Sequence, residues 1–179
     1  MAHIDTTPLV RASVWIRPNG EAFERLVKAI RVVRQRVEGP PVQPHVSLLG
    51  GIETSEAVAA IRLKRLATRL KPFQIRLGKL EWRDEYYRAF YAAVEPNEML
   101  ELAHKAAHEA FEMMPPDPFE PHVSLAYGKL DDATRKALAE ALDGRLDVTF
   151  TATSVCLVNA SESVPIPEWR TVAEQPLQG

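Results

Sequence analysis

Two copies of the pentapeptide Pro-His-Val-Ser-Leu constrain the fold of this chain more than any other feature of its sequence. They occupy residues 44–48 and 121–125 of the 179-residue chain, 77 positions apart. In a chain of this length, an identical repeat of five residues is expected by chance on the order of one time in a hundred. The elements predicted around the two copies also repeat in the same order, so the chain consists of two similar halves.

Each copy alternates polar and aliphatic residues, as in a β-strand whose two faces differ. Side chains alternate faces along a strand, so His45 and Ser47 share one face while the aliphatic residues share the other. The second copy places His122 and Ser124 together in the same way. If the two copies face each other, two imidazoles and two hydroxyls surround one small anion.

The hydrophobic pattern predicts the series strand, helix, histidine strand, helix, strand in each half. In the first half these elements are expected at 9–17, 21–37, 44–48, from about 54 to 71, and 73–82. In the second half they are expected at 87–95, 98–113, 121–127, 131–142 and 146–158, followed by an extra strand at about 168–175. Asp131 is the expected N-cap of the helix at 131–142. No low-complexity linker separates the repeats, which span about 9–82 and 86–158.

This series predicts an α+β fold for residues 1–179, as a single bilobal domain. Two pseudo-symmetric lobes of antiparallel sheet with outer helices are expected around a central groove, and each lobe mixes elements from both halves. The inward pattern of the strand at 73–82 slips between Leu77 and Leu80, which predicts a β-bulge at Gly78. In the helix from about 54, Val58, Ile61 and Leu70 are expected to face the core.

Composition and charge indicate a cytoplasmic globular protein. Cys156 is the sole cysteine, which excludes an intrachain disulfide, and its apolar neighbours predict a core position. No uncharged apolar run could span a bilayer, and residues 1–5 carry no signal pattern. We expect a monomer that needs no membrane and no cofactor.

The net charge of −2 is unevenly distributed along the chain. Residues 1–90 hold 16 Lys/Arg against 9 Asp/Glu, and residues 91–179 hold 6 against 15. Exposed helix faces account for most of the basic residues, although an anion-binding side is an alternative. The overall charge argues against a long RNA as the partner. The basic first half is still consistent with binding to RNA 3′ ends.

Two histidines and two serines suit acid–base cleavage of a phosphoester without a metal ion. Histidine has an unperturbed pKa of about 6.5, so one ring can act as a base toward water while the other acts as an acid toward the leaving oxygen. Ser47 and Ser124 would donate hydrogen bonds to the phosphate oxygens, on which negative charge builds.

Three aromatic residues are further candidates for the groove. Trp15 shares its strand face with polar neighbours, so it either stacks on a nucleobase or is a half-buried structural residue. Tyr87 and Tyr91 share a face of the strand expected at 87–95, and one of them either lines the groove or packs under a helix.

Two further histidines, His104 and His108, are spaced like metal ligands on one helix. That helix is expected to bury a set of apolar residues, namely Met99, Leu102, Ala103, Ala106, Ala110 and Phe111. Both histidines then lie on the solvated side with charged neighbours, and no third ligand is evident in the sequence. We therefore expect no metal site.

The paired His-x-Ser motifs in a duplicated α+β chain resemble those of the 2H phosphoesterase superfamily. The chain looks most like the small cyclic phosphodiesterases, through residues 14–18, 43–48 and 120–128. The likeness covers about residues 9–175. It implies a two-lobed fold with a central groove, no metal, and opening of a 2′,3′-cyclic nucleotide or ADP-ribose 1″,2″-cyclic phosphate to a monoester.

The resemblance also implies roles for individual residues. His45 and His122 match the catalytic pair, with His122 activating water and His45 protonating the leaving oxygen, an order that could be reversed. Ser47 and Ser124 match the hydroxyls that hold the phosphate, and Tyr127 matches a tyrosine that contacts it. Strand alternation alone would place the Tyr127 side chain on the face opposite to His122. The first motif has Gly50 at the position equivalent to Tyr127, so the pseudo-symmetry of the two halves is incomplete.

Two alternatives remain open at this point. One is an RNA-end processing enzyme acting on a terminal 2′,3′-cyclic phosphate or a 2′–5′ linkage. The other is a catalytically silent nucleotide-binding module, although binding alone would not require two titratable groups in equivalent positions.

Overall fold

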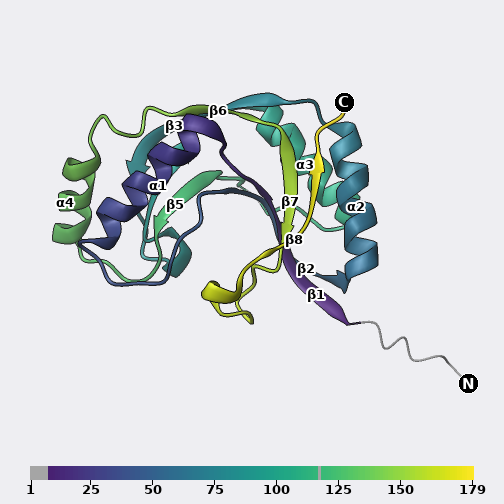
Figure 1. Ribbon diagram of the computed structural model, residues 1–179, viewed down its shortest axis with the longest axis horizontal. Helices are drawn as coiled ribbons and strands as arrows, with labels where there is room; N and C mark the ends of the chain where they lie inside the picture. The colour runs from purple at the N-terminus through teal and green to yellow at the C-terminus, as the bar shows by residue number, and fades with distance from the viewer. Residues whose placement is uncertain (1–7, 117) are drawn as a thin grey trace, which may run out of the picture.

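The computed structural model describes residues 8–116 and 118–179, and its strands form a single curled antiparallel sheet (Figure 1). The strands are β1 (Leu9–Ile16), β2 (Val46–Ser55), β3 (Phe73–Glu81), β4 (Phe90–Val94), β5 (His122–Ala126), β6 (Thr149–Ala152), β7 (Ser154–Val158) and β8 (Thr171–Pro176). The helices are α1 (Gly20–Arg34), α2 (Glu56–Arg69), α3 (Glu98–Phe111) and α4 (Asp132–Leu142). Residues 1–5, where no targeting signal is expected, lie outside the described residues.

The strand order β6-β3-β4-β5-β2-β1-β7-β8 mixes the two halves of the chain on each side of the sheet. Helix α1 comes from the first half but contacts β5 and β6, which belong to the second. Helix α3 comes from the second half but packs with α2 against β2 (Figure 1). The predicted α+β fold of antiparallel sheet with outer helices is therefore confirmed.

Several local predictions are also confirmed. The β3–β4 register shifts between Leu77 and Leu80, across Gly78, as expected for a bulge. The Asp131 side chain caps α4 by accepting a hydrogen bond from the Thr134 amide at 2.7 Å. Cys156 is fully buried in the sheet.

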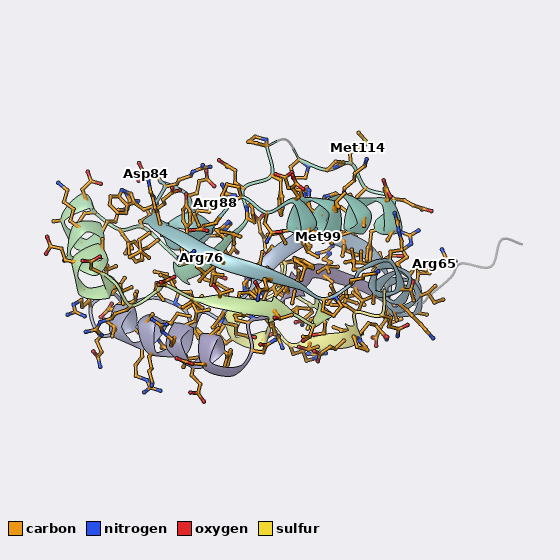
Figure 2. All side chains as sticks on the ribbon, turned by 90° about the horizontal axis from the view of Figure 1, so that it is seen from above. Arg65, Arg76, Asp84, Arg88, Met99 and Met114 are labelled. Atoms are coloured by element: carbon orange, nitrogen blue, oxygen red, sulfur yellow. The ribbon has the colours of Figure 1, made fainter. Side chains whose placement is uncertain are left out.

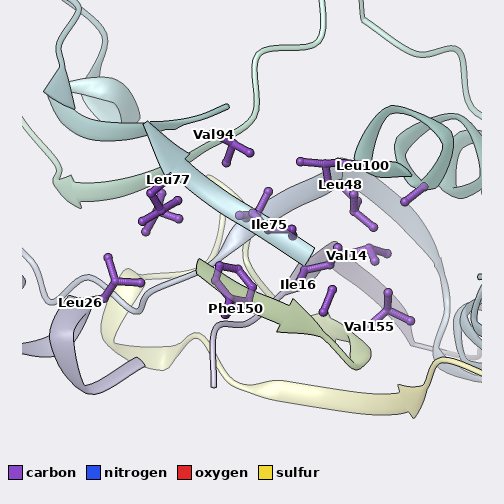
Figure 3. Packing of buried hydrophobic residues seen from close by; sticks show 14 of the residues in the cluster. Val14, Ile16, Leu26, Leu48, Ile75, Leu77, Val94, Leu100, Phe150 and Val155 are labelled. Atoms are coloured by element: carbon purple, nitrogen blue, oxygen red, sulfur yellow. The ribbon is translucent and has the colours of Figure 1, made fainter. Parts of the chain in front are cut away.

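The core is apolar and draws on both halves of the chain. Figure 3 shows Ile75 of β3, Phe150 of β6 and Val14 of β1 among the packed core residues, and each is at most 5% exposed. No helix in the described residues is both long and apolar enough to cross a membrane.

The predicted inward faces of α2 and α3 are partly wrong. Val58 and Ile61 are 37% and 54% exposed, and Met99 and Leu102 are 40% and 56% exposed, although Leu70 is buried as expected. The two helices instead bury stripes that include several alanines. The buried alanines are Ala59, Ala67, Ala103, Ala106 and Ala107. Small side chains let the two helices approach each other closely. Because apolar residues occur around much of each helix, the sequence pattern did not determine which face is buried.

Oppositely charged groups from the two halves of the chain pair with one another. Arg62 and Arg69 of α2 contact Glu112 and Glu109 near the end of α3, each at 2.7 Å. Arg76, labelled in Figure 2 and about half exposed at its side chain, lies 3.2 Å from Asp147. These pairs are at least partly exposed, so they contribute little to stability. They place several basic side chains of the first half beside acidic side chains of the second half.

We predict that Leu63 and Ile61, two residues apart on α2, differ strongly in their contribution to stability. Leu63 is fully buried, so Leu63→Ala should lower the free energy of unfolding by about 2–5 kcal/mol. Ile61→Ala, at an exposed position, should change it by less than about 1 kcal/mol. Urea unfolding of both variants measures the difference, and a larger loss for Ile61→Ala would contradict the observed helix face.

Candidate functional site

The two pentapeptides meet at the middle of the sheet. Strands β2 and β5 pair in antiparallel fashion with Val46 opposite Val123, so the motifs are related by an approximate two-fold axis at this point. Both valines are fully buried. Because strand side chains alternate, His45 and His122 lie on the opposite face, at the start of each motif strand.

That face borders a groove of about 590 Å³. All seven residues expected at the site line it, namely Trp15, His45, Ser47, Tyr87, His122, Ser124 and Tyr127. The sequence therefore identified residues that lie together although they come from separate segments of the chain. Ser13, Glu85, Arg88, Trp169 and residues 160–163 line the groove as well and were not expected there.

The backbone fixes the orientation of both imidazoles in the same way. Nδ1 of His45 lies 2.7 Å from the carbonyl oxygen of Gln43, and Nδ1 of His122 lies 3.0 Å from that of Glu120. A carbonyl oxygen only accepts hydrogen bonds, so Nδ1 carries the proton in each ring and donates it. Nε2 is then left with its lone pair in each neutral ring, ready to accept a proton.

Burial favours the neutral form of both rings. It lowers the pKa of His45 to about 3, and the nearby His122 and Arg17 act in the same direction, against the Gln43 hydrogen bond. Burial also lowers the pKa of His122, with added effects of Arg88 and Arg83, while the Glu120 carbonyl opposes the shift. An anion bound between the rings would favour the protonated form of either.

Trp15 supports His45 rather than offering an open stacking surface. The two rings stack at a centroid distance of 3.5 Å with an angle of 8° between their planes, and Trp15 is only 1% exposed. A nucleobase cannot reach the face of Trp15 that His45 covers. The alternative expectation, a half-buried Trp15, is also wrong. The indole instead forms the wall against which the imidazole rests.

An aromatic cluster forms another part of the groove wall. The Tyr87 and Tyr127 rings lie 5.2 Å apart, and each lies 6.2 Å from Trp169. Tyr127 reaches this position because β5 ends at Ala126, so strand alternation no longer applies to it. Burial raises the pKa of Tyr127, which therefore stays a neutral hydroxyl.

Tyr87 and Tyr91 do not share a strand, contrary to the sequence prediction. Tyr87 lies in a 3₁₀ turn (Tyr86–Arg88), and β4 starts only at Phe90. Tyr91 is buried, donates to Glu81 at 3.3 Å, and places its ring 5.0 Å from that of His122. The Gly128 amide donates to the Tyr86 carbonyl at 2.8 Å, which connects this turn to the residue that follows Tyr127.

The two motif serines have different surroundings. Ser124 is 5% exposed, and its hydroxyl donates to the Tyr87 carbonyl at 2.8 Å. Ser47 is exposed at the groove. Ser47 can donate to a ligand directly, whereas Ser124 would first have to turn away from Tyr87.

His104 and His108 are buried at 6% and 4% exposure, so their predicted solvated position is wrong. The face of α3 that packs inward includes both rings, and His104 stacks on Phe119 at 3.7 Å with a 7° angle between the planes. Burial lowers the pKa of His104 to about 4, with His108 adding to the effect. No cluster of three or more His, Cys, Asp or Glu that could hold a metal occurs in the described part of the chain.

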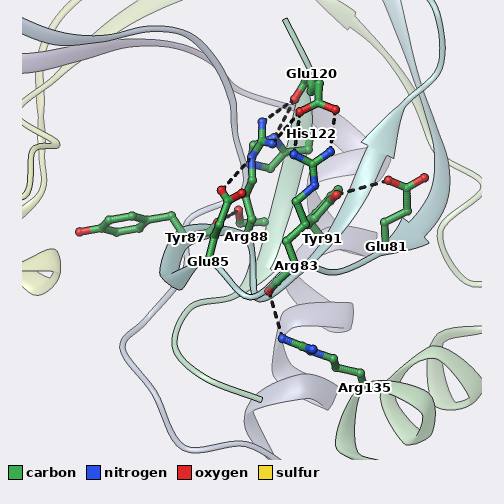
Figure 4. A network of polar contacts seen from close by, with 10 residues as sticks. Glu81, Arg83, Glu85, Tyr87, Arg88, Tyr91, Glu120, His122 and Arg135 are labelled. Carbon is green, nitrogen blue, oxygen red and sulfur yellow. Dashed lines mark hydrogen bonds and ion pairs between the residues drawn. The ribbon is translucent and has the colours of Figure 1, made fainter. Parts of the chain in front are cut away.

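A network of charged groups adjoins His122 and was missed in the sequence (Figure 4). Glu120 accepts from Arg83 at 2.6 and 2.7 Å and from Arg88 at 3.0 Å. These contacts lower the pKa of Glu120 to about 2. One available signal was the parallel between Gln43-Pro44-His45 and Glu120-Pro121-His122, which places a polar side chain two residues before each histidine.

Comparison with known proteins gives a consistent set of relatives. A family model described as the 2′-5′ RNA ligase superfamily matches residues 18–163. A cyclic phosphodiesterase of Arabidopsis thaliana is 23% identical over 166 residues, covering 90% of this chain and 92% of the relative.

Solved structures agree with the fold. LigT of E. coli complexed with 3′-AMP has a TM-score of 0.66 and 14% identity, covering 96% of this chain and 100% of that one. The protein TT0787 of Thermus thermophilus has a TM-score of 0.64 and 23% identity, covering 94% and 98%.

We predict that His45 makes the protein less stable at mildly acidic pH. The unfolded chain protonates this residue below about pH 6.5, whereas the folded chain resists protonation down to about pH 3, so acidification in that window favours unfolding. The His45→Asn variant should therefore lose about 1–2 kcal/mol less stability than the parent between pH 7 and pH 5. Urea unfolding at both pH values measures this, and equal losses would contradict a neutral buried His45.

Proposed function

Because the chain belongs to the 2′-5′ RNA ligase superfamily, also called the 2H phosphoesterases, we propose that it hydrolyses a cyclic phosphodiester of a small nucleotide to a phosphomonoester. The substrate would be a 2′,3′-cyclic nucleotide or ADP-ribose 1″,2″-cyclic phosphate. One observation carries the proposal, namely two imidazoles that share a groove and each keep Nε2 available. The likeness to the Arabidopsis cyclic phosphodiesterase supports it.

In the proposed reaction, one imidazole accepts a proton from water as the water oxygen bonds to phosphorus. The bond from phosphorus to one sugar oxygen breaks, and the second imidazole, protonated beforehand, donates its proton to that oxygen. The two histidines thus exchange protonation states, and a proton exchange with solvent restores them. The chemistry needs a proton donor and a proton acceptor near neutral pH, which paired histidines provide.

We assign the base role to His122 and the acid role to His45. Arg83 and Arg88 lie near His122 and favour its neutral form, in which it can accept a proton, and Arg17 acts on His45 in the same direction. His45 stacks on the Trp15 indole, and an aromatic face attracts a cation, so the indole favours the imidazolium once a phosphate anion binds. The contact between His45 and Trp15 supports the order of roles that the family resemblance implies.

The hydroxyls along the groove would hold the non-bridging phosphate oxygens. Ser47 is already exposed there, and Ser124 would exchange its bond to Tyr87 for one to the phosphate. Tyr127 adds a neutral hydroxyl to the same wall. Hydrogen bonds of this kind strengthen as charge builds on the oxygens in the transition state.

The charge of the groove favours a small substrate over an RNA strand. Among the described residues that line it, Arg88 alone is cationic, and it already pairs with Glu120. Glu85 and Glu162 line the groove as well and are exposed. Binding of several phosphates needs clustered basic residues, and this surface does not provide them.

RNA-end processing is the second candidate, and the family description favours it. Its substrate would be a 2′,3′-cyclic phosphate at an RNA terminus or a 2′–5′ linkage. The crystal structure of E. coli LigT with 3′-AMP supports nucleotide binding in this fold without distinguishing the two candidates. A silent binding module would bind the same nucleotides and turn over none of them.

We predict that His45→Ala and His122→Ala each reduce kcat for a 2′,3′-cyclic mononucleotide by about 10²–10⁴-fold. The double variant should be little worse than the less active single one, because the two groups act as a unit. Turnover is measured with EDTA present, since we expect no metal requirement. Near-normal activity of either single variant would contradict the assignment.

The same variants distinguish the base from the acid. A phosphodiester with a nitrophenolate leaving group needs little protonation of that oxygen, so His45→Ala should recover much of its lost activity on this substrate. His122→Ala should remain impaired, because water still needs a base. The opposite pattern would reverse the two roles, and Glu109→Gln, at a distant exposed ion pair, is the control for nonspecific effects.

We predict a preference for mononucleotide-sized substrates that depends only weakly on salt. For such a substrate, kcat/KM should change less than about tenfold between low and physiological salt, because few phosphates are neutralised on binding. The comparison is a cyclic mononucleotide against an oligonucleotide ending in a cyclic phosphate, in one salt titration. A clear preference for the oligonucleotide that collapses as salt rises would favour RNA-end processing.

A further inference from the structure

Glu120 connects the motif strand β5 to the segment between β3 and β4. Its carboxylate accepts a pair of hydrogen bonds from Arg83 and a further one from Arg88 (Figure 4). Arg135 of α4, 6% exposed at its side chain, donates to the Arg83 carbonyl at 3.0 Å and anchors this segment from the other side. The arginines are therefore held in place by the fold.

The backbone of Glu120 is part of the same arrangement. Its carbonyl oxygen accepts from Nη2 of Arg88 at 3.1 Å and from Nδ1 of His122 at 3.0 Å. Arg88 thus binds Glu120 at both its side chain and its backbone. The carbonyl that sets the tautomer of His122 is itself fixed by a guanidinium.

The first half contains a matching but neutral arrangement. Gln43 stands two residues before His45, and its carbonyl accepts from Nδ1 of that ring. Its side-chain oxygen accepts from Arg17 at 3.3 Å, and its amide nitrogen donates to the Trp169 carbonyl at 3.3 Å. An arginine therefore anchors the residue behind each histidine, but only the anchored residue in the second half carries a charge.

We propose that Glu120 and Arg88 are positioning residues for His122, holding the ring in place and setting its charge state. The Glu120 carboxylate, which has no counterpart at Gln43, favours proton uptake by His122, so His122 is the stronger proton acceptor of two otherwise similar histidines and is suited to be the base. The proposal rests on the proposed function only where it calls His122 the base. The contacts themselves exist whatever the substrate is.

Charged and titratable groups reach His122 from several elements. Arg83, Arg88 and Glu120 are the nearest, and Glu85 lies 4.0 Å from Arg88. The remaining groups near the ring are Tyr91 of β4, His45 across the groove, and His104 and His108 of α3 in an adjoining hollow. Positive neighbours disfavour the imidazolium and negative neighbours favour it, so removing one charge of each sign should have opposite effects.

The test is an NMR titration of His122 in the full chain and in two variants. Glu120→Gln removes a negative charge, so the His122 midpoint should fall by roughly half a unit to one unit. Arg88→Gln removes a positive charge, so the midpoint should rise by a similar amount. Glu109→Gln removes one side of a comparable ion pair between α2 and α3 and should leave the midpoint unchanged.

A reciprocal variant tests the same idea in the first half. Gln43→Glu introduces a carboxylate at the matching position beside His45, so the His45 midpoint should rise while that of His122 stays near its parent value. This variant also keeps the proposal testable if Arg88→Gln does not fold. Unchanged midpoints, or shifts in the same direction for Glu120→Gln and Arg88→Gln, would overturn the proposal.

Kinetics provide the second readout. Glu120→Gln should lower kcat by about 3–30-fold with little change in KM, and the limb of the pH–rate profile due to His122 should follow the NMR midpoint. A purely structural role would change activity without moving that limb. If the parent chain turns over no cyclic phosphate, the proposed function fails, while the titrations still decide the role of Glu120 and Arg88.

Discussion

The pairing of β2 with β5 at Val46 and Val123 is the contact on which the rest of the site depends. It brings together two motifs that are 77 residues apart in sequence, and it does so in antiparallel fashion, so each histidine lies beside the axis that relates the halves. The buried valines hold this register, because a slip by one residue would turn the histidines into the core. The stability of the sheet and the geometry of the groove therefore have the same origin.

Burying two imidazoles opposes folding at acidic pH and prepares the site for chemistry at neutral pH. Each ring loses water, so its neutral form is favoured, and each keeps one backbone carbonyl as its partner. The backbone thus settles the tautomer without any titratable group in the hydrogen bond. A bound phosphate would then supply the negative charge that stabilises one imidazolium.

The departures from two-fold symmetry bear on function more than the symmetry does. A symmetric pair of histidines would have no preferred direction of proton transfer. Gln43 and Glu120 differ in charge, Ser47 and Ser124 differ in burial, and Trp15 stacks on one histidine alone among the described contacts. Each difference acts directly on the surroundings of one ring, so the two halves can take different roles.

The sequence by itself determined the order of the helices and strands up to residue 142, the bulge at Gly78, the Asp131 cap and the shared face of each His-Ser pair. The single strand expected at 146–158 is wrong, because the structure has two strands there, β6 beside β3 and β7 beside β1. These features follow from local spacing, since side chains alternate along a strand and caps act within one helical turn. Tertiary structure alone decided which stripe of α2 and α3 is buried, that His104 and His108 lie inside, and that Trp15 is covered by His45. It also brought Trp169 and the Arg83–Glu120–Arg88 network to the groove. Those outcomes depend on contacts between residues far apart in the chain, which no local period encodes.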